Sequence, residues 1–527
     1  MPETQKYLTG ALTHRLAAID IGTNSMRLVV AEALRDGNYR VLDEEREPTR
    51  LGRSLQATGK LDAEAVESSL AALRRFRQIA EGYQIGELRA IATCAVREAG
   101  NGGLFCRRAL DETGIEIKVI SAEQEADLAF CSVRRNFDLK GKNVVIADIG
   151  GGSTEIVLAS GSLIEAVFPT DLGAVRLSEI FGGGQSMAGE DYDRMLEAID
   201  RRLRKKTRKL RFQPHLLIGS GGTFTSVASM LMSERNQSGL PMRGYQVSRA
   251  DLLHLLDRLR KLSPKARRDV PGLNADRADI IVAGLAIIDR IMVRYDLNAM
   301  QIHSGGVRDG LILSMIEQLQ GGQTAQPVDR DAALDRFARA CGAEIDHGRQ
   351  VARLAGQIYQ QLAEPLALAA EDQPLLEAAA RLQDVGYLIN YDQHHKHSYH
   401  LILNSRLSGF QPHELELIAN IARYHRGAEP KKKHANYKQL SDPDRARVKQ
   451  MAAILRIAGG LDRSHSQQVQ GVTVDATNGD VELHIFAPAD PDVDLWAARR
   501  RAGLFEKVFG TALTIDWNGK NTPPKDS

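Results

Sequence analysis

The sequence predicts an α/β protein of three or four domains, and three observations indicate this. An apolar run, an acidic glycine-containing loop and a second apolar segment follow one another twice, around residues 20–25 and 148–153, which is the pattern of strand, tight loop and strand. A Ser-Gly-Gly turn joins an apolar strand to an apolar helix twice, in residues 216–227 and 301–316. Finally, 527 residues are too many for one core, since a domain holds roughly 100 to 200 residues.

Both acidic loops, DIGTNS at 20–25 and DIGGGS at 148–153, carry groups suited to phosphate. Glycine lets the backbone approach a ligand closely, so that N–H groups and neighbouring hydroxyls can face phosphate oxygens. The predicted phosphate-binding residues of the two loops are Thr23, Asn24, Ser25, Gly151, Gly152 and Ser153. Asp20 and Asp148 would repel phosphate unless a divalent cation lay between them and the ligand. The pair therefore predicts a phosphate clamp, and the alternative is two hairpin turns without a ligand.

Strands and helices alternate before residue 320. We expect strands at 39–45 and 88–92, helices at 63–82 and from 122 onward, and a new unit from residue 143. A helix start reached through glycines is a natural anion site. The first Ser-Gly-Gly turn therefore adds Gly221, Gly222 and Thr223 as phosphate ligands, with Gly305 and Gly306 of the second turn as further candidates. Without a ligand, these turns would only connect strand to helix.

The pattern changes after the linker at residues 319–329, which holds Gly and Pro and few apolar residues. Apolar residues then recur at helical spacing, and we expect helices up to about residue 458. The end of the chain predicts strands at 472–474, 481–486 and 512–517, a helix at 495–508 and a frayed tail at 520–527.

The composition excludes several classes of protein. With 43% hydrophobic and 26% charged residues and a net charge of +2, nothing points to a membrane or a specific nucleic acid. Two basic runs, 201–211 and 431–433, are interpreted as solvated helix faces, with a track for a polyanion as the alternative. The four cysteines form no CxxC pair, and the longest apolar run, 280–288, is too short to span a bilayer. The N-terminus also lacks a signal-peptide core, so we expect a cytoplasmic protein.

A phosphate clamp with a cation suits the hydrolysis of a phosphoanhydride. This reaction also needs a base for the attacking water, and an arginine is expected on the phosphate oxygens. Glu123 and Glu125 stand at an expected helix start behind Ser121, where their other role would be to complement the helix dipole; spacing alone does not choose between them. Arg97 follows a predicted strand and could hold phosphate oxygens, or form an ordinary ion pair. Glu155 is a third candidate cation ligand beside the two loop aspartates, with a solvent-facing strand position as its alternative.

Four motifs together resemble one family: DIGTNS at 20–25, ATCAVRE at 92–98, DIGGGSTE at 148–155 and GSGGT at 219–223. They are similar to the exopolyphosphatase/guanosine pentaphosphate phosphohydrolase (Ppx/GppA) family of the actin-like superfamily. The resemblance implies two actin-like (ribonuclease-H-like) domains, 12–136 and 137–320, with the active site between them. It also implies Glu125 as the general base, Asp148 and Glu155 as magnesium ligands, and Arg97 on the terminal phosphates. Ala122 and Gln124 depart from the family pattern around the base, with Glu123 as the fallback.

The second half resembles the all-α HD-like domain of the longer members, at 331–468, followed by a small C-terminal α+β piece at 469–520. His347, Asp384 and Asp462 match positions of an HD metal centre, but Gln383 replaces its second histidine. An amide is a poor substitute for imidazole in such a centre, so we expect no working HD metal centre. The histidine-rich run 394–400 and the segment 424–426 are expected to contact phosphates or pack an interface, with zinc binding as the alternative.

The leading hypothesis is an exopolyphosphatase that uses Mg²⁺ or Mn²⁺, with K⁺ as a further candidate ion. The nearest alternative is hydrolysis of guanosine pentaphosphate (pppGpp) at the same site. An ATP-dependent kinase and a non-catalytic sensor of polyphosphate or nucleotide are alternatives of other classes. The resemblance also suggests a homodimer.

Overall fold

The computed structural model describes residues 14–34, 37–182, 189–207, 213–237, 239–320, 329–405, 407, 409–476, 479–517 and 519. The chain forms two compact units, residues 1–327 and residues 328–527. Three segments singled out in the sequence fall outside the described residues: the basic residues 208–211, most of the linker (321–328) and the tail (520–527).

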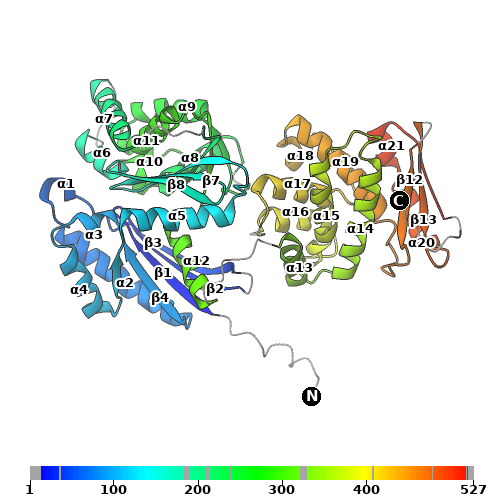
Figure 1. Cartoon of the computed structure of the whole chain (residues 1–527), viewed down its shortest axis with the longest axis horizontal. Coiled ribbons are helices and arrows are strands. Elements are labelled where there is room, and N and C mark those ends of the chain that lie inside the picture. Colours follow the sequence, from blue (N-terminus) through cyan, green and yellow to red (C-terminus); the bar gives the residue numbers. More distant parts are fainter. Residues whose placement is uncertain are drawn as a thin grey trace, which may run out of the picture. The chain divides into compact units, whose positions relative to one another are not determined.

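The first sheet of the N-terminal unit has the strand order β3-β2-β1-β4-β5 (Figure 1). Its strands are β1 (Arg15–Ile21), β2 (Met26–Ala33), β3 (Tyr39–Glu47), β4 (Glu87–Ala92) and β5 (Ile117–Val119). The first three are antiparallel neighbours, while β4 and β5 run parallel to β1. Helix α2 (Ala63–Gly82) begins where predicted, because Asp62 accepts a hydrogen bond from the Ala65 N–H, and it buries Phe76 in the same core as Ile19 of β1.

The second sheet has the order β10-β11-β9-β6-β7-β8. Its strands are β6 (Asn143–Ile149), β7 (Thr154–Ser160), β8 (Leu163–Thr170), β9 (Leu216–Ser220), β10 (Gln246–Ser248) and β11 (Ala299–Ile302). Strands β6, β7 and β8 are antiparallel, and β9 and β11 continue in parallel. The order and the directions of β8-β7-β6-β9-β11 therefore repeat those of the first sheet, with β10 added at the edge.

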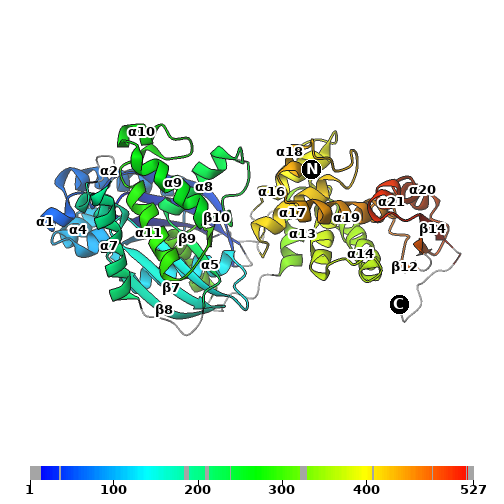
Figure 2. The ribbon, with the colours of Figure 1, turned by 90° about the horizontal axis from the view of Figure 1, so that it is seen from above.

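Helices cover both sheets of the unit (Figures 1 and 2). Besides α2 they are α1 (Leu55–Thr58), α3 (Cys94–Glu98), α4 (Gly102–Thr113), α5 (Ala122–Asn136), α6 (Ala174–Ile180), α7 (Glu190–Lys206), α8 (Gly222–Glu234), α9 (Arg249–Lys261), α10 (Pro264–Arg268), α11 (Ile281–Arg294) and α12 (Val307–Leu319). The apolar run at 280–288 lies in α11 and is buried in the core of the second sheet. None of the helices in the described part of the chain has the length and apolarity that a membrane crossing requires.

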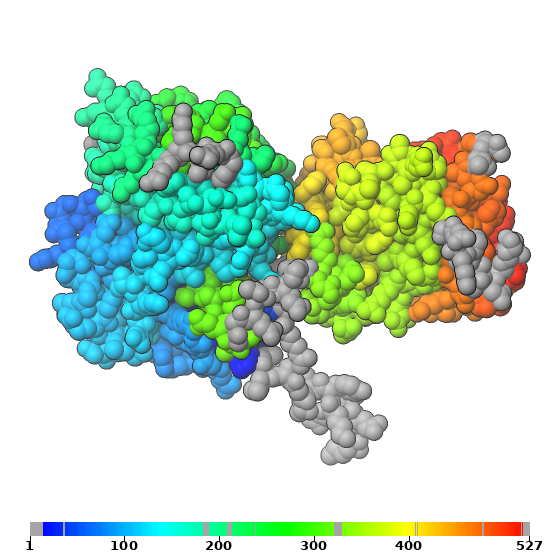
Figure 3. Space-filling view, viewed as in Figure 1, coloured from blue at the N-terminus to red at the C-terminus, as the bar shows by residue number. Residues whose placement is uncertain are grey.

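Two helices pack across the boundary between the two sheets. Helix α5 precedes the second sheet in the chain, yet its Phe130 and Val133 share a core with strands β6 and β7. Helix α12 comes last, yet its Leu311 and Ile312 return to pack on β1 and β2, and its green surface lies beside blue N-terminal residues in Figure 3. The packing therefore crosses the predicted boundary after residue 136 and ties the two sheets together.

The basic run at 201–211 enters the structure as the last turns of α7. Arg201, Arg204, Lys205 and Lys206 are exposed there, and positive charge near a helix C-terminus complements the helix dipole. The second run, 431–433, is also exposed. Both observations fit solvated surfaces.

A buried histidine stands where the second sheet meets α5. His303 follows β11, and its Nε2 lies 2.8 Å from the hydroxyl oxygen of Ser132. Burial lowers the pKa of His303 from 6.5 to about 4, while Asp309 raises it and Arg243 lowers it further. Between these two pH values the folded unit binds fewer protons than the unfolded chain, so its free energy of unfolding falls as the pH falls.

We therefore expect His303 to cost the N-terminal unit about 2 kcal/mol of its free energy of unfolding on going from about pH 8 to about pH 5. His303→Gln keeps a hydrogen-bonding group beside Ser132 but does not titrate, so it should remove this part of the acid sensitivity. Urea unfolding of both proteins at the two pH values measures the difference. An equal loss of the free energy of unfolding in the wild type and in His303→Gln would contradict this role of His303.

The C-terminal unit begins with helices and ends with a small sheet. Its helices are α13 (Arg330–Ala340), α14 (Ile345–Leu362), α15 (Gln373–Leu382), α16 (His394–Leu403), α17 (Pro412–Arg423), α18 (Ala435–Lys438) and α19 (Asp442–Ala458), followed by α20 (Asp492–Arg500) and α21 (Gly503–Phe509). Strands β12 (Gly471–Asp475), β13 (Val481–Phe486) and β14 (Leu513–Trp517) form the sheet in that order. The predicted helical and mixed segments are both present.

One predicted element of this unit is wrong. The single helix expected at 495–508 is two helices, α20 and α21, separated by a turn at Arg501 and Ala502. Gly503 begins the second helix, and glycine inside a helix costs roughly 1 kcal/mol relative to alanine, which makes a break at this point inexpensive.

Candidate active site

The two acidic hairpins have the same register. Asp20 pairs with Arg27 across β1 and β2, and Asp148 pairs with Glu155 across β6 and β7. The same backbone hydrogen bond closes both loops, from Gly22 N–H to the Ser25 carbonyl at 3.2 Å and from Gly150 N–H to the Ser153 carbonyl at 3.0 Å. Arg27 therefore occupies in the first hairpin the position that Glu155 occupies in the second.

The tips of the two loops touch each other. A Cβ atom built on Gly151 would lie 2.9 Å from Cβ of Thr23. One built on Gly152 would lie 2.6 Å from the buried, free thiol sulfur of Cys94. Only glycine permits so close an approach at either position, which explains this loop's glycine content without assuming a ligand. The decisive sequence prediction, that the two loops face one another, is confirmed.

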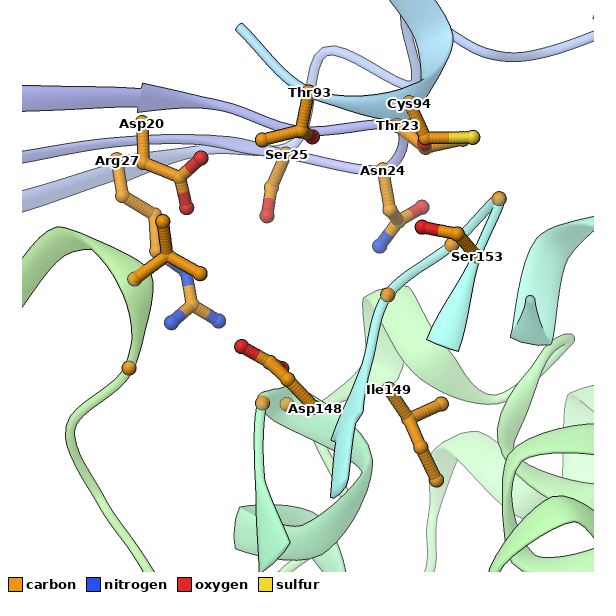
Figure 4. Close-up of a pocket in the computed structure, with 18 of the residues that line it drawn as sticks. Asp20, Thr23, Asn24, Ser25, Arg27, Thr93, Cys94, Asp148, Ile149 and Ser153 are labelled. Atoms are coloured by element: carbon orange, nitrogen blue, oxygen red, sulfur yellow. The ribbon is translucent and has the colours of Figure 1, made fainter. Parts of the chain in front are cut away.

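The loops border a cleft of about 830 Å³, part of it open to solvent, whose walls come from both sheets. Asp20 and Asp148 point into the same space, with the guanidinium of Arg27 between them (Figure 4). The predicted site residues that line the cleft are Asp20, Thr23, Asn24, Ser25, Glu125, Asp148, Gly151, Gly152, Ser153, Gly221 and Gly222. Gly305 and Gly306 line it as well.

Both Ser-Gly-Gly turns reach the carboxylate of Asp148. Gly221 has a φ of 92°, a conformation that favours glycine, and a Cβ there would lie 2.8 Å from one Asp148 oxygen. A Cβ on Gly306 would lie 3.9 Å from the other oxygen. Gly222 gives room to Arg277, whose Nη2 would otherwise stand 1.7 Å from a Cβ.

Three predicted residues stand behind the lining. Thr223 is buried in the first turn of α8, where a Cβ on Gly284 would lie 2.6 Å from its methyl carbon. Glu155 is only 2% exposed, which rules out the solvent-facing alternative. Arg97 reaches the site through Glu125, with Nη1 3.2 Å from the Glu125 carboxylate and 2.9 Å from the Ile120 carbonyl oxygen.

Glu125 owes its position to the start of α5. Ser121 caps this helix by accepting the Gln124 N–H, while the Gln124 side chain accepts the Ser121 N–H, so that a capping box forms at the helix start expected behind Ser121. This directs Glu125 inward and leaves Glu123 exposed. Burial raises the pKa of Glu125 to about 8, against the opposing charge of Arg97.

The carboxylates of the cleft repel one another. Burial, and then the charge of Asp20, raise the pKa of Asp148 to about 6. Burial also raises the pKa of Asp20 and, together with the charge of Glu125, that of Glu155. Oε1 of Glu155 is buried without a hydrogen-bonding partner. Oxygen donors under mutual repulsion fit a hard divalent cation such as Mg²⁺ or Mn²⁺.

Arginines that the sequence analysis did not single out complete the walls: Arg27, Arg277 and Arg308 all line the cleft. Burial lowers the pKa of Arg27, and the neighbouring charge of Arg308 lowers it further. Guanidinium groups match phosphate oxygens in geometry and charge, so an anionic ligand would relieve their repulsion. Alignment of the two hairpins, residue by residue, would have pointed to Arg27.

The repeated sheet order and the glycine loops that meet across the cleft make the N-terminal unit an actin-like α/β protein. The chain belongs to the Ppx/GppA phosphatase family: the family model matches residues 29–319, and the model of domain III of the same family matches residues 330–492. The resemblance drawn from the four motifs is thereby confirmed, and the protein is a phosphohydrolase.

Solved structures support the same fold. A Ppx/GppA family member from Aquifex aeolicus is 26% identical with a TM-score of 0.50, over 59% of this chain and 99% of that one. An exopolyphosphatase from Cytophaga hutchinsonii is 24% identical with a TM-score of 0.54, over 60% of this chain and 100% of that one. The second similarity shows the fold alone.

Proposed function

We propose that this protein is an exopolyphosphatase, which removes the terminal phosphate from inorganic polyphosphate by attack of water. The observation that carries the proposal is the contact between the two glycine loops across a cleft that holds both carboxylates and arginines. Such a cleft suits a chain of phosphates whose charge is shared between arginines and a cation. The family membership supports phosphatase chemistry.

In this proposal the loops hold the substrate. The N–H groups and hydroxyls of both loops would bind the terminal phosphates, and the Gly221–Gly222 turn would add the start of α8. Asp20, Asp148 and Glu155 would hold Mg²⁺ or Mn²⁺, with K⁺ as a further candidate ion. When bound, the divalent ion would neutralise charge that develops on the terminal phosphoryl group.

Glu125 is the proposed general base. Its carboxylate is buried beside the cleft, and a pKa near the working pH suits a group that takes a proton from water. Nη1 of Arg97 lies 3.2 Å from this carboxylate. We propose that Arg97 also binds the terminal phosphates, which requires its side chain to turn toward the cleft.

The second candidate is hydrolysis of pppGpp at the same site, because the loops would contact its phosphates in the same way and part of the cleft is open to solvent. A kinase would need a further site for the acceptor of the phosphate. A non-catalytic sensor would bind the ligand without releasing phosphate. We also retain as proposals the four-domain division, the HD-like character of the helical part, a homodimer and a cytoplasmic location, with no specific nucleic acid and no membrane as partners.

A phosphate-release assay on long-chain polyphosphate, pppGpp and ATP side by side, with and without Mg²⁺, tests the proposal. We expect magnesium-dependent release with the highest kcat/KM on polyphosphate. Equal or higher kcat/KM on pppGpp would make the second candidate the main function. Transfer from ATP to an acceptor would support a kinase, and binding without release would support a sensor.

A further inference from the structure

Three side chains, none of which lines the cleft described above, converge in the helical part of the C-terminal unit. Asp384 follows α15, His394 begins α16, and His425 follows α17. Nε2 of His394 lies 3.2 Å from Oδ1 of Asp384, and Nε2 of His425 lies 3.7 Å from the same oxygen. One potential ligand atom from each residue lies within 4.8 Å of the other two.

Backbone hydrogen bonds orient both imidazoles. Nδ1 of His394 lies 3.1 Å from the carbonyl oxygen of Tyr391, and Nδ1 of His425 lies 2.7 Å from that of Ala422. A carbonyl oxygen only accepts, so each Nδ1 donates its hydrogen. In the neutral imidazole, each Nε2 then presents a lone pair toward the Asp384 carboxylate. Metal-binding histidines are held in this way, with the second nitrogen donating to a carbonyl or carboxylate.

The arrangement leaves a polar atom without a partner. His394 is 1% exposed, and its Nε2 is buried with no hydrogen bond. Two lone pairs that face a carboxylate oxygen repel it unless a proton or a metal cation lies between them. The cluster therefore contains a buried, unpaired nitrogen aimed at the place where an ion would lie.

The neighbouring HD-type positions do not offer an equivalent site. His347 has both nitrogens against carboxylates, Nδ1 2.8 Å from Asp462 and Nε2 3.5 Å from the second oxygen of Asp384. Gln383 brings an amide nitrogen 3.4 Å from the same Nε2. His347 is thereby held between two carboxylates, and its contact to Oδ2 of Asp384 holds that carboxylate with Oδ1 turned toward the two other histidines.

We propose that Asp384, His394 and His425 bind a divalent transition-metal ion of the zinc class in the helical part of this unit. Two imidazoles and one carboxylate are ligands that such ions prefer, and they leave a position for water. Bonds of about 2.0–2.1 Å in a tetrahedral site place neighbouring ligand atoms roughly 3.3 Å apart. The separations of 3.2 Å and 3.7 Å are close to this value.

The ion would have a structural effect, because its ligands come from three successive helical segments. It would join the end of α15 to the start of α16 and the end of α17. Arg501 interacts with the charge of Asp384 and is repelled by Arg463 and Arg426. The charge of these arginines weakens attraction for a cation while favouring an anion as a fourth ligand. The proposal stands independently of the substrate of the N-terminal cleft.

Cobalt substitution of the full-length wild-type protein tests the site without a mutation. We expect about one equivalent of Co²⁺ to bind in the presence of excess Mg²⁺, with visible absorption bands of a tetrahedral or five-coordinate ion, and stoichiometric Zn²⁺ to remove the bands. Absence of these bands in folded protein would overturn the proposal.

Variants locate the ion. His394→Gln and His425→Gln should each weaken Zn²⁺ binding by about 10-fold or more and reduce the zinc-induced rise in Tm. His400→Asn is the matched control, since it removes an exposed imidazole from the same helix, and Asp148→Asn controls for binding in the cleft. Loss of Zn²⁺ binding in either control, or full binding in both His→Gln variants, would contradict the assignment. Circular dichroism of each variant verifies that it is folded.

Discussion

Glu125→Gln should lower kcat on polyphosphate by about 10²- to 10⁴-fold, because an amide cannot take the proton of the attacking water. The affinity for polyphosphate should stay within a few-fold, since the phosphates are held mainly by the loops. The carboxamide has the same shape as the carboxylate and can still contact Arg97, so the helix start should remain intact. Steady-state kinetics and a direct binding measurement on the same preparation separate the two effects.

Glu123→Gln is the matched control for this experiment. Glu123 belongs to the same turn of α5 but is exposed, whereas Glu125 is buried beside the cleft. The control should keep near-normal activity. Retained turnover in Glu125→Gln combined with a large loss in Glu123→Gln would transfer the role of base to Glu123.

Asp148→Asn should lower activity by about 10²- to 10³-fold, since the loss of one ligand to the cation removes several kcal/mol of charge stabilisation. Asp148 lies between the two Ser-Gly-Gly turns and repels Asp20. The variant should therefore need much more Mg²⁺ to reach its reduced maximum rate. A magnesium titration of phosphate release measures both quantities.

The same substitution should have the opposite effect on stability without metal. Removal of one of several mutually repelling buried carboxylates should leave the Tm in EDTA equal to or higher than that of the wild type, while the rise in Tm on adding Mg²⁺ should shrink. Lower Tm in EDTA together with an unchanged response to Mg²⁺ would show that Asp148 serves the fold and does not bind the cation.

Local chemistry explains why so much could be predicted before the structure. The acidic loops, the helix start behind Ser121 and the strands on either side of each loop involve residues close together in the chain. Local composition and side-chain periodicity are therefore enough to predict them. The start of α2 at Ala63 is also set locally, because the neighbouring Asp62 caps the helix. The break between α20 and α21 was missed, although Gly503 was a signal for it.

Alignment of the two hairpins singles out Arg27, but spacing alone does not say what its side chain contacts. Its place between Asp20 and Asp148 depends on how the two sheets face each other. The same holds for Thr223, which the motif suggested as a phosphate ligand and which packs behind the lining against Gly284. The cluster of Asp384, His394 and His425 joins residues from three helical segments.

Short-range patterns were sufficient for the two hairpins and the change to helices after the linker, since hydrogen bonding and side-chain alternation act over a few residues. The meeting of the loops, the position of α5 and α12 across the boundary between the sheets and the burial of Glu155 depend on contacts between residues far apart in the chain. Apolar surfaces far apart in the chain are matched only when the whole unit folds, and that matching places the charges of the cleft opposite one another.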